Sequence, residues 1–182
     1  MISDFTSPAQ RLIGALRGVV DSVPSLGAAE KARRVAQVLE PFLAQPDLLS
    51  AKQLEADSQQ YRQHVLYVDP NGAFSVVALV WLPGQQTPIH DHVSWCVVGT
   101  FRGQEEEIRY ELVKNGDGES YLVPVGGALS RTGTTAYLTP PGDIHAVRNS
   151  TDGKVVSIHV YGADVTALGS SIRRRYDLPV HA

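Results

Sequence analysis

The chain has 182 residues, of which 43% are hydrophobic and 19% charged, and its formal net charge is −3. These values are typical of one globular domain with a hydrophobic core. The sequence has no row of basic residues that would offset the negative charge, which excludes nucleic acid as a main partner. No apolar run reaches the roughly 18 residues that a membrane span needs, and the region around Asp4 lacks a signal-type apolar segment. A single cysteine, Cys96, excludes an internal disulfide framework. We therefore expect a cytoplasmic protein.

Residues 1–60 are predicted to form a helical lead-in that packs on the rest of the chain. Helix starts are predicted at Ser7-Pro8 and at Ser25, and Gln45-Pro46-Asp47 should end a helix. One apolar face recurs at spacings of three and four residues, as an amphipathic helix requires. Its members are Ala32, Val35, Val38, Leu39, Phe42 and Leu43.

Residues 61–182 are predicted to form short β-strands and a C-terminal tail. β-branched and aromatic runs alternate here with Gly-, Pro- and Asn-rich turns, a pattern typical of a sandwich or barrel. The tail from Asp164 is predicted to return to helix, and the basic run Arg173-Arg174-Arg175 to be a solvated helix face. The predicted strands are residues 74–82, 95–101, 108–113, 121–125, 135–138, 146–149 and 155–161.

A metal site is predicted from three histidines. His90 and His92 lie one residue apart on an extended segment, so their side chains point to the same side. His145 follows a Pro-Gly turn that delivers it at the start of a strand. Neutral imidazole nitrogens that converge in this way are ligands for a first-row metal ion.

The strand-rich segment resembles the cupin family. The first cupin motif runs Gly, five residues, His-x-His, three or four residues, Glu, six residues, Gly. Gly84, His90, His92 and Gly103 match it, whereas Cys96 occupies the Glu position.

The second cupin motif, Pro-x-Gly-x-x-His-x-x-x-Asn, is met by Pro140, Gly142, His145 and Asn149. Its upstream Gly is displaced by one residue, to Gly133. The resemblance implies a mostly β fold, a single cupin double-stranded β-helix (jelly-roll barrel) with an N-terminal helical segment.

Within the cupins, the chain resembles the thiol dioxygenases, which include cysteine dioxygenase and 3-mercaptopropionate dioxygenase. Cys96 in the Glu position, three histidine ligands and the run Ser157-Ile158-His159-Val160-Tyr161 carry this resemblance. It implies a non-haem enzyme that uses Fe(2+) and O2 to convert a small thiol to its sulfinic acid. Three neutral imidazoles leave the ion its full 2+ charge, which favours a thiolate as the next ligand.

The resemblance also assigns catalytic roles to Ser157, His159, Tyr161 and Cys96. The first three share strand parity and would form a relay that orients the substrate and donates a hydrogen bond at the metal. The alternative is a buried polar network that only satisfies itself. In some relatives the cysteine joins the active-site tyrosine through a thioether, which here would link Cys96 to Tyr161. The alternative is a small buried hydrophobe.

Substrate contacts are predicted for Tyr61 and Gln63, which match the family's substrate-facing segment, while Arg62 should point the other way. An Arg in place of Gln63 would offer a bidentate fork to an α-carboxylate, and Gln offers only a neutral amide. Gln63 therefore favours 3-mercaptopropionate-like or other non-cysteine thiols. Cysteine itself and a bulkier thiol, such as a thioimidazole, are the alternatives.

Two other classes of function remain open, a different metal-dependent cupin reaction such as isomerisation, and a metal-binding sensor without turnover. Fold alone does not separate them. We expect a monomer or small homo-oligomer, with no nucleic acid or membrane partner. Four further residues are predicted to have no catalytic part: His64, His181, Trp81 and Trp95.

Overall fold

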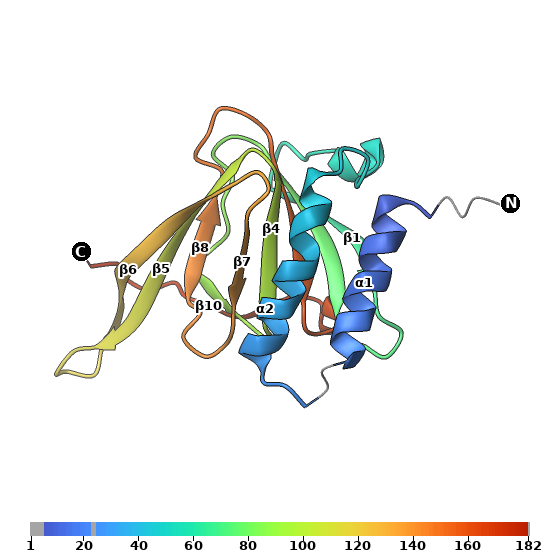
Figure 1. Cartoon of the computed structure of the whole chain (residues 1–182). Helices are drawn as coiled ribbons and strands as arrows, with labels where there is room; N and C mark the ends of the chain where they lie inside the picture. The colour runs from blue at the N-terminus through green and yellow to red at the C-terminus, as the bar shows by residue number, and fades with distance from the viewer. Residues whose placement is uncertain (1–5, 23–24, 182) are drawn as a thin grey trace, which may run out of the picture.

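The structure, a computed structural model, describes residues 6–22 and 25–181, so Asp4 lies outside it. Helical elements come first and strands follow (Figure 1). The helical elements are α1 (Pro8–Ser22), α2 (Ala28–Leu39), η1 (Glu40–Ala44), η2 (Ala51–Leu54) and α3 (Val165–Leu168). The strands are β1 (Arg62–Val68), β2 (Ser75–Trp81), β3 (His90–His92), β4 (Cys96–Arg102), β5 (Gln104–Lys114), β6 (Ser120–Arg131), β7 (Thr135–Leu138), β8 (His145–Arg148), β9 (Val155–Tyr161) and β10 (Ile172–Arg175).

The strands form two five-stranded antiparallel sheets, ordered β1-β2-β9-β4-β7 and β10-β3-β8-β5-β6. This confirms the predicted mostly β, double-stranded β-helix fold with an N-terminal helical segment. The first sheet carries the relay strand β9, and the second carries the predicted metal ligands on β3 and β8. The site therefore lies between the two sheets.

Helices α1 and α2 run side by side across the outer face of the first sheet (Figure 1). Every residue of β2 and β9 is buried, because these strands have helices on one face and the second sheet on the other. Burial on both faces explains the nearly continuous apolar run of β2, whereas β9 also buries the polar Ser157 and His159. The close approach of α2 requires Gly99, since a Cβ there would come within 2.8 Å of Leu39.

The predicted helix limits are partly right. Helix α1 begins at Pro8, and Ser7 and Gln10 form reciprocal side-chain to backbone hydrogen bonds at its start, at 3.2 and 2.8 Å. Helix α2 begins at Ala28 rather than at Ser25, and the following 3₁₀ turn ends at Ala44, before the predicted break.

The strand limits and the tail differ more. Strands β7 and β9 have the predicted limits, whereas β6 continues to Arg131, through the glycines at which the prediction ended. Gly127 is needed there, because a Cβ would lie 2.4 Å from the Glu107 carbonyl oxygen on β5. The tail was predicted to be helical and forms one turn, α3, followed by β10, which pairs with β3.

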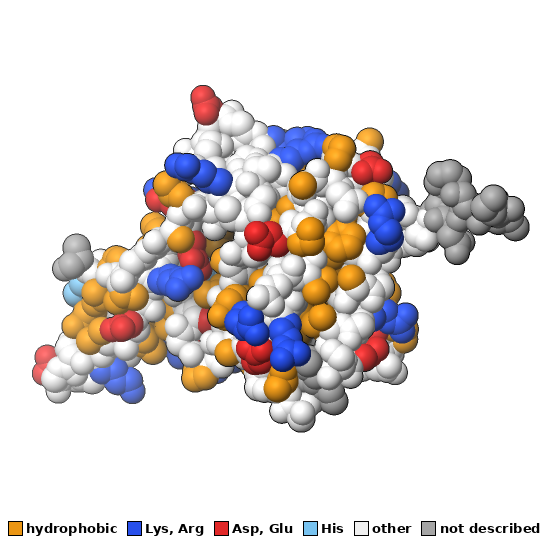
Figure 2. Space-filling model, viewed as in Figure 1, with side chains coloured by type: hydrophobic (Ala, Val, Ile, Leu, Met, Phe, Trp, Pro, Cys, Tyr) orange, Lys and Arg blue, Asp and Glu red, His pale blue; other side chains and the backbone are white. Residues whose placement is uncertain are grey.

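The far end of the second sheet is a long hairpin of β5 and β6, on which Leu112, Val125 and Leu129 are exposed. Hydrophobic side chains gather on the surface over this hairpin (Figure 2). Within the described residues, no helix has the length and apolar character to cross a membrane.

Candidate metal centre and active site

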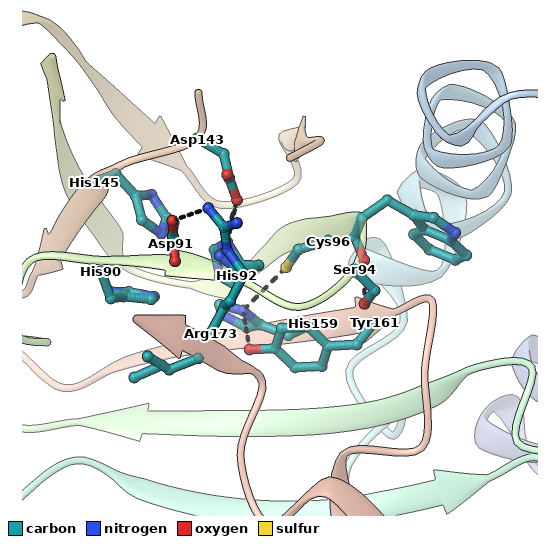
Figure 3. Close-up of polar contacts among 12 residues, drawn as sticks. His90, Asp91, His92, Ser94, Cys96, Asp143, His145, His159, Tyr161 and Arg173 are labelled. Carbon is teal, nitrogen blue, oxygen red and sulfur yellow. Dashed lines mark hydrogen bonds and ion pairs between the residues drawn. The ribbon is translucent and has the colours of Figure 1, made fainter. Parts of the chain in front are cut away.

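His90, His92 and His145 converge between the sheets, where their candidate ligand atoms lie within 4.8 Å of one another (Figure 3). Strand β3 carries the first two, and His145 opens β8 directly opposite His90 in the β3–β8 pairing. All three side chains are buried. The structure thus brings together the three residues that the sequence predicted as metal ligands.

The Nδ1 atoms of these rings face away from the centre and are hydrogen-bonded. His90 Nδ1 lies 2.9 Å from the carbonyl oxygen of Pro88, which only accepts, so His90 carries its proton on Nδ1. His92 Nδ1 donates to Asp143 Oδ2 at 2.9 Å, and the same oxygen accepts from the His92 backbone N–H at 3.1 Å. Both rings therefore present an unprotonated Nε2 to the centre.

His145 shows the same arrangement with a carboxylate behind it. Its Nδ1 donates to Glu107 Oε1 at 2.8 Å, while its buried Nε2 has no hydrogen-bond partner among the described residues. A buried ring nitrogen without a partner is costly unless something occupies its lone pair. A metal ion fits this requirement, and carboxylates that orient ligand imidazoles are usual around metal sites.

The charge states of these groups suit metal binding. Burial, and then the neighbouring His145 and His92, lower the pKa of His90 to about 3, so the ring stays neutral. Burial also lowers the pKa of His145. Burial raises the pKa of Glu107 and Asp143, but their hydrogen bonds to the histidines outweigh it, and both pKa values are lowered overall. Burial thus favours the neutral forms of His90 and His145, and two ionised carboxylates lie behind the centre.

Neither carboxylate was identified from the sequence. Asp143 stands two residues before His145 in the Pro-Gly turn, and this proximity was an available signal. Glu107 is on β5, which pairs with β8 so that Arg109 lies opposite His145. No local sequence pattern links Glu107 to the site.

Ser157, His159 and Tyr161 form a continuous hydrogen-bonded chain on β9. Ser157 Oγ lies 2.9 Å from His159 Nε2, and His159 Nδ1 lies 3.2 Å from the Tyr161 hydroxyl. Burial, and then the charges of the three metal-site histidines, lower the pKa of His159 to about 3. Burial raises the pKa of Tyr161 well above its usual range. The chain is neutral and ends on a protonated phenol.

Cys96 is fully buried beside this chain, with Sγ 3.9 Å from His159 Nδ1 (Figure 3). Burial raises the pKa of the Cys96 thiol, so it is protonated. In the β4–β9 pairing, Cys96 stands directly opposite Tyr161. The structure therefore brings together the two residues of the predicted thioether.

A cavity of about 500 Å³ opens in front of the three histidines and is lined by Tyr61, Gln63 and Tyr161. Gln63 pairs with Leu79 on the inner side of the sheet. Arg62 pairs with Val80 on the helix side, where its guanidinium reaches Glu55 at 3.3 Å. The Arg62 side chain thus turns toward Glu55, as the strand parity predicted, although the residue also borders the cavity.

Tyr61 reaches the cavity by packing on Trp81, with ring centroids 4.5 Å apart. Burial raises the pKa of Tyr61, and the nearby Gln63 side chain opposes that change. Trp81 also donates from Nε1 to Ser157 Oγ at 3.2 Å, so it forms cavity wall and contacts the relay.

The basic run Arg173-Arg174-Arg175 was predicted to be a solvated helix face; the three residues are exposed, but the helix is wrong. The run lies on β10, and each side chain has a different contact because a bulge interrupts the pairing with β3. Arg173 binds the buried Asp91, and Arg174 lies over the Tyr176 ring. Arg175 pairs with His90 and lines the cavity, so it brings a cation to the site.

The residues predicted to be non-catalytic lie outside the metal centre. His64 Nε2 contacts the Glu55 carbonyl oxygen at 2.9 Å, and His181 stacks on Tyr121. Trp95 is buried in the core beneath the helices.

The chain is similar to several solved structures and matches one known family. Among solved structures, a conserved double-stranded β-helix protein from Klebsiella pneumoniae has a TM-score of 0.46 and 17% identity, covering 62% of this chain and 85% of its own. A Cupin 2 conserved barrel protein from Salinispora arenicola has a TM-score of 0.42 and 26% identity, with coverages of 62% and 83%. The sequence pattern of the family described as "Cysteine dioxygenase type I" matches residues 25–169. This match spans most of the chain, and the chain therefore belongs to the cysteine dioxygenase type I family.

Proposed function

We propose that the protein is a non-haem iron thiol dioxygenase, which converts a small thiol and O2 to a sulfinic acid. The observation that carries the proposal is the convergence of three unprotonated Nε2 atoms on a buried centre next to the phenol of Tyr161. Imidazole ligands alone also suit zinc, copper and nickel. Membership of the cysteine dioxygenase type I family supports the choice of iron and of a thiol.

His90, His92 and His145 would hold the ion through Nε2. When bound, ferrous iron supplies the Lewis acidity that ionises a thiol and the redox chemistry that O2 requires. The chain contributes position and charge. The hydrogen bonds at Nδ1 fix the ring orientations, and the three histidine side chains are themselves buried.

Tyr161 is proposed to orient the substrate through its hydroxyl. The phenol keeps its proton because burial raises its pKa, and His159 holds its position from Nδ1. A positioned hydroxyl in a buried site can donate a hydrogen bond to charge that develops during the reaction. A metal-binding sensor needs no such relay, so the relay favours catalysis over sensing.

For the substrate, we propose a non-cysteine thiol with an anionic group. Gln63 is neutral and lines the cavity on β1, whereas Arg175 lines it on β10 and pairs with His90. An arginine on the β10 side can hold a carboxylate while the thiol faces the histidines. Arg62, which binds Glu55, is less available for this task.

A bulkier thiol is the second candidate, because the cavity volume of about 500 Å³ exceeds what a three-carbon thiol needs. Cavities of roughly 300–1,000 Å³ accept ligands of drug-like size. A thioimidazole would fit this class.

The test is oxygen uptake by protein loaded anaerobically with ferrous iron, measured together with product analysis. The panel is 3-mercaptopropionate, cysteine and a thioimidazole, and zinc(II)-loaded protein is the control. We expect one sulfinate formed per O2 consumed for at least one thiol, and none with zinc. Thiol binding without uptake would indicate a sensor, and uptake without sulfinate would indicate a different oxidation.

A further inference from the structure

A buried carboxyl that the proposed reaction does not use lies at the Ser157 end of the relay. Glu105 precedes Glu107 by two residues on β5, so both side chains point into the barrel. Glu105 is 3% exposed, and its Oε1 has no hydrogen-bond partner among the described residues. The Ser157 hydroxyl and the Trp81 indole N–H lie close enough to lower the pKa of its carboxyl.

We propose that Glu105 is a positioning residue, which sets the direction of every hydrogen bond from Ser157 to Tyr161. The inference rests on the proposed function, in which the Tyr161 phenol orients the substrate. Each hydrogen bond in the chain uses one proton, so the position of the protons determines the direction of every bond.

Ser157 is the branch point. The Trp81 indole can only donate, so at 3.2 Å from Ser157 Oγ it uses one of the lone pairs of that oxygen. The hydroxyl has a single proton, which it can give either to Glu105 or to His159 Nε2 at 2.9 Å. The state of the carboxyl decides between the two.

When Glu105 is ionised, it can only accept, and the Ser157 hydroxyl donates to it. Ser157 Oγ must then accept from His159, whose proton is on Nε2. The unprotonated Nδ1 accepts from the Tyr161 hydroxyl at 3.2 Å. In this state the phenol proton points at His159 and away from the substrate.

When Glu105 is protonated, its O–H donates to Ser157 Oγ and every bond reverses. Ser157 donates to Nε2, and His159 carries its proton on Nδ1, from which it donates to the Tyr161 oxygen. The phenol proton is then free to donate into the cavity. The His159 ring is neutral in both states, as its lowered pKa requires.

The surroundings of Glu105 make both states accessible. Burial, and then the charge of Glu107 on the same strand, raise its pKa, while Ser157 and Trp81 lower it, and the balance is about 7. Among the titratable groups of the other sheet, Cys96 on β4 and Tyr161 on β9 interact electrostatically with it, and Ser157 connects it to His159. The pKa values of Cys96 and Tyr161 are raised and that of His159 is lowered, so all three stay neutral where Glu105 titrates.

The direct test is the position of the proton on the His159 ring. Nitrogen-15 NMR distinguishes the two neutral tautomers, and zinc(II)-loaded full-length protein keeps the metal site filled and diamagnetic. The His159 signals are those that disappear in His159→Gln. We expect the proton on Nδ1 at the acid end of the Glu105 titration and on Nε2 at its alkaline end.

Glu105→Gln should give one tautomer at both pH values, since the amide does not ionise. Ser157→Ala, which interrupts the contact between Glu105 and His159, should also abolish the pH response. The matched control is Glu106→Gln on the same strand, where Glu106 instead pairs with Arg148 at 2.9 Å, and it should keep the wild-type response. A wild-type tautomer that ignores pH, or a Glu105→Gln protein that titrates as wild type does, overturns the inference.

These measurements need no turnover. Protein that forms no sulfinate from any thiol would refute the proposed function, and the ring tautomers would still decide the role of Glu105. In active enzyme, Glu105→Gln should remove the pH dependence of kcat near pH 7 while bound metal stays at the wild-type level. A change in metal content would instead indicate a structural role and overturn the assignment.

Discussion

Cys96 and Tyr161 lie directly opposite each other on β4 and β9, with both side chains in the interior between the sheets. The next pair of residues fixes this register. The Gly162 N–H donates to the Trp95 carbonyl oxygen at 2.9 Å, and the Trp95 ring fills the space where a Cβ on Gly162 would lie 2.2 Å away. Directly opposed residues have Cβ atoms about 4.5–5.5 Å apart, so the sulfur can reach the phenol ring without a strand shift.

This pairing predicts that iron-loaded protein forms the Cys96–Tyr161 thioether under air. The thiol S–H and a ring C–H are lost, an S–C bond forms, and O2 takes up the two electrons and two protons. Intact-mass measurement should show a loss of two hydrogens, and digestion should give one joined peptide. Cys96→Ser is the control and should keep the full mass. Cys96 that remains fully alkylatable after denaturation, following many turnovers, would show a plain buried thiol.

The relay predicts that Tyr161→Phe retains the metal and slows turnover by about ten- to a thousandfold, as expected for a lost positioned proton donor. His159→Gln should weaken the same step, because the phenol loses its partner at 3.2 Å. Tyr137→Phe, at an exposed position on β7, is the matched control and should behave as wild type. If both relay variants consume oxygen at the wild-type rate and form sulfinate from it, the network has only a structural role.

His159 also predicts a pH dependence of stability. Its pKa is 6.5 in a model peptide and about 3 in the fold, so between these values the unfolded chain binds a proton that the folded chain excludes. His159 therefore lowers the free energy of unfolding as the pH falls from 6.5 to about 3. The loss is about 1.4 kcal/mol per pH unit for one proton.

Denaturant unfolding of metal-free protein between pH 6 and 4 checks this, with His159→Gln as the comparison. The difference in slope between the two proteins isolates His159 from the carboxyl groups that titrate in the same range. Equal slopes would mean that His159 is protonated in the folded protein.

The metal ligands could be predicted from sequence because their geometry is local. The strand period places His90 and His92 on one side, and the Pro-Gly turn delivers His145. The shared face of Ser157, His159 and Tyr161 has the same origin, since they alternate along one strand, whereas their role as a relay came from the family resemblance. Short-range rules also predicted most strands, whose limits moved by a few residues where pairing overrode local preference.

The remaining site residues are brought together by pairing between strands that are distant in the sequence. Arg175 meets His90 because β10 adds to β3, and Glu107 meets His145 because β5 adds to β8. Glu105 reaches the relay across the space between the two sheets. No periodicity within a segment encodes which strand becomes its neighbour, so the basic run on β10 was assigned to a helix face.

Arg175 predicts substrate preference. Arg175→Gln should lower kcat/KM for 3-mercaptopropionate by roughly tenfold, or about 1.4 kcal/mol, because an exposed charged contact is partly screened by solvent. A thiol without a carboxylate should change little. Arg174→Gln on the same strand is the control, because Arg174 lies over the Tyr176 ring and does not line the cavity. Gln63→Arg should shift the preference toward cysteine. Equal losses for charged and uncharged thiols would show that Arg175 does not contact the anionic group.

The central claim is that the three-histidine centre binds the iron at which a thiol is oxygenated. Its most direct test measures iron content and thiol-dependent oxygen uptake on the same samples of wild type, His92→Ala and His64→Ala. His92 lies in the centre with a ligand nitrogen, whereas His64 contacts only a carbonyl oxygen outside it. We predict about one iron per chain and sulfinate formation in wild type and His64→Ala, and loss of most iron and all turnover in His92→Ala. Wild-type iron content and activity in His92→Ala would contradict the account.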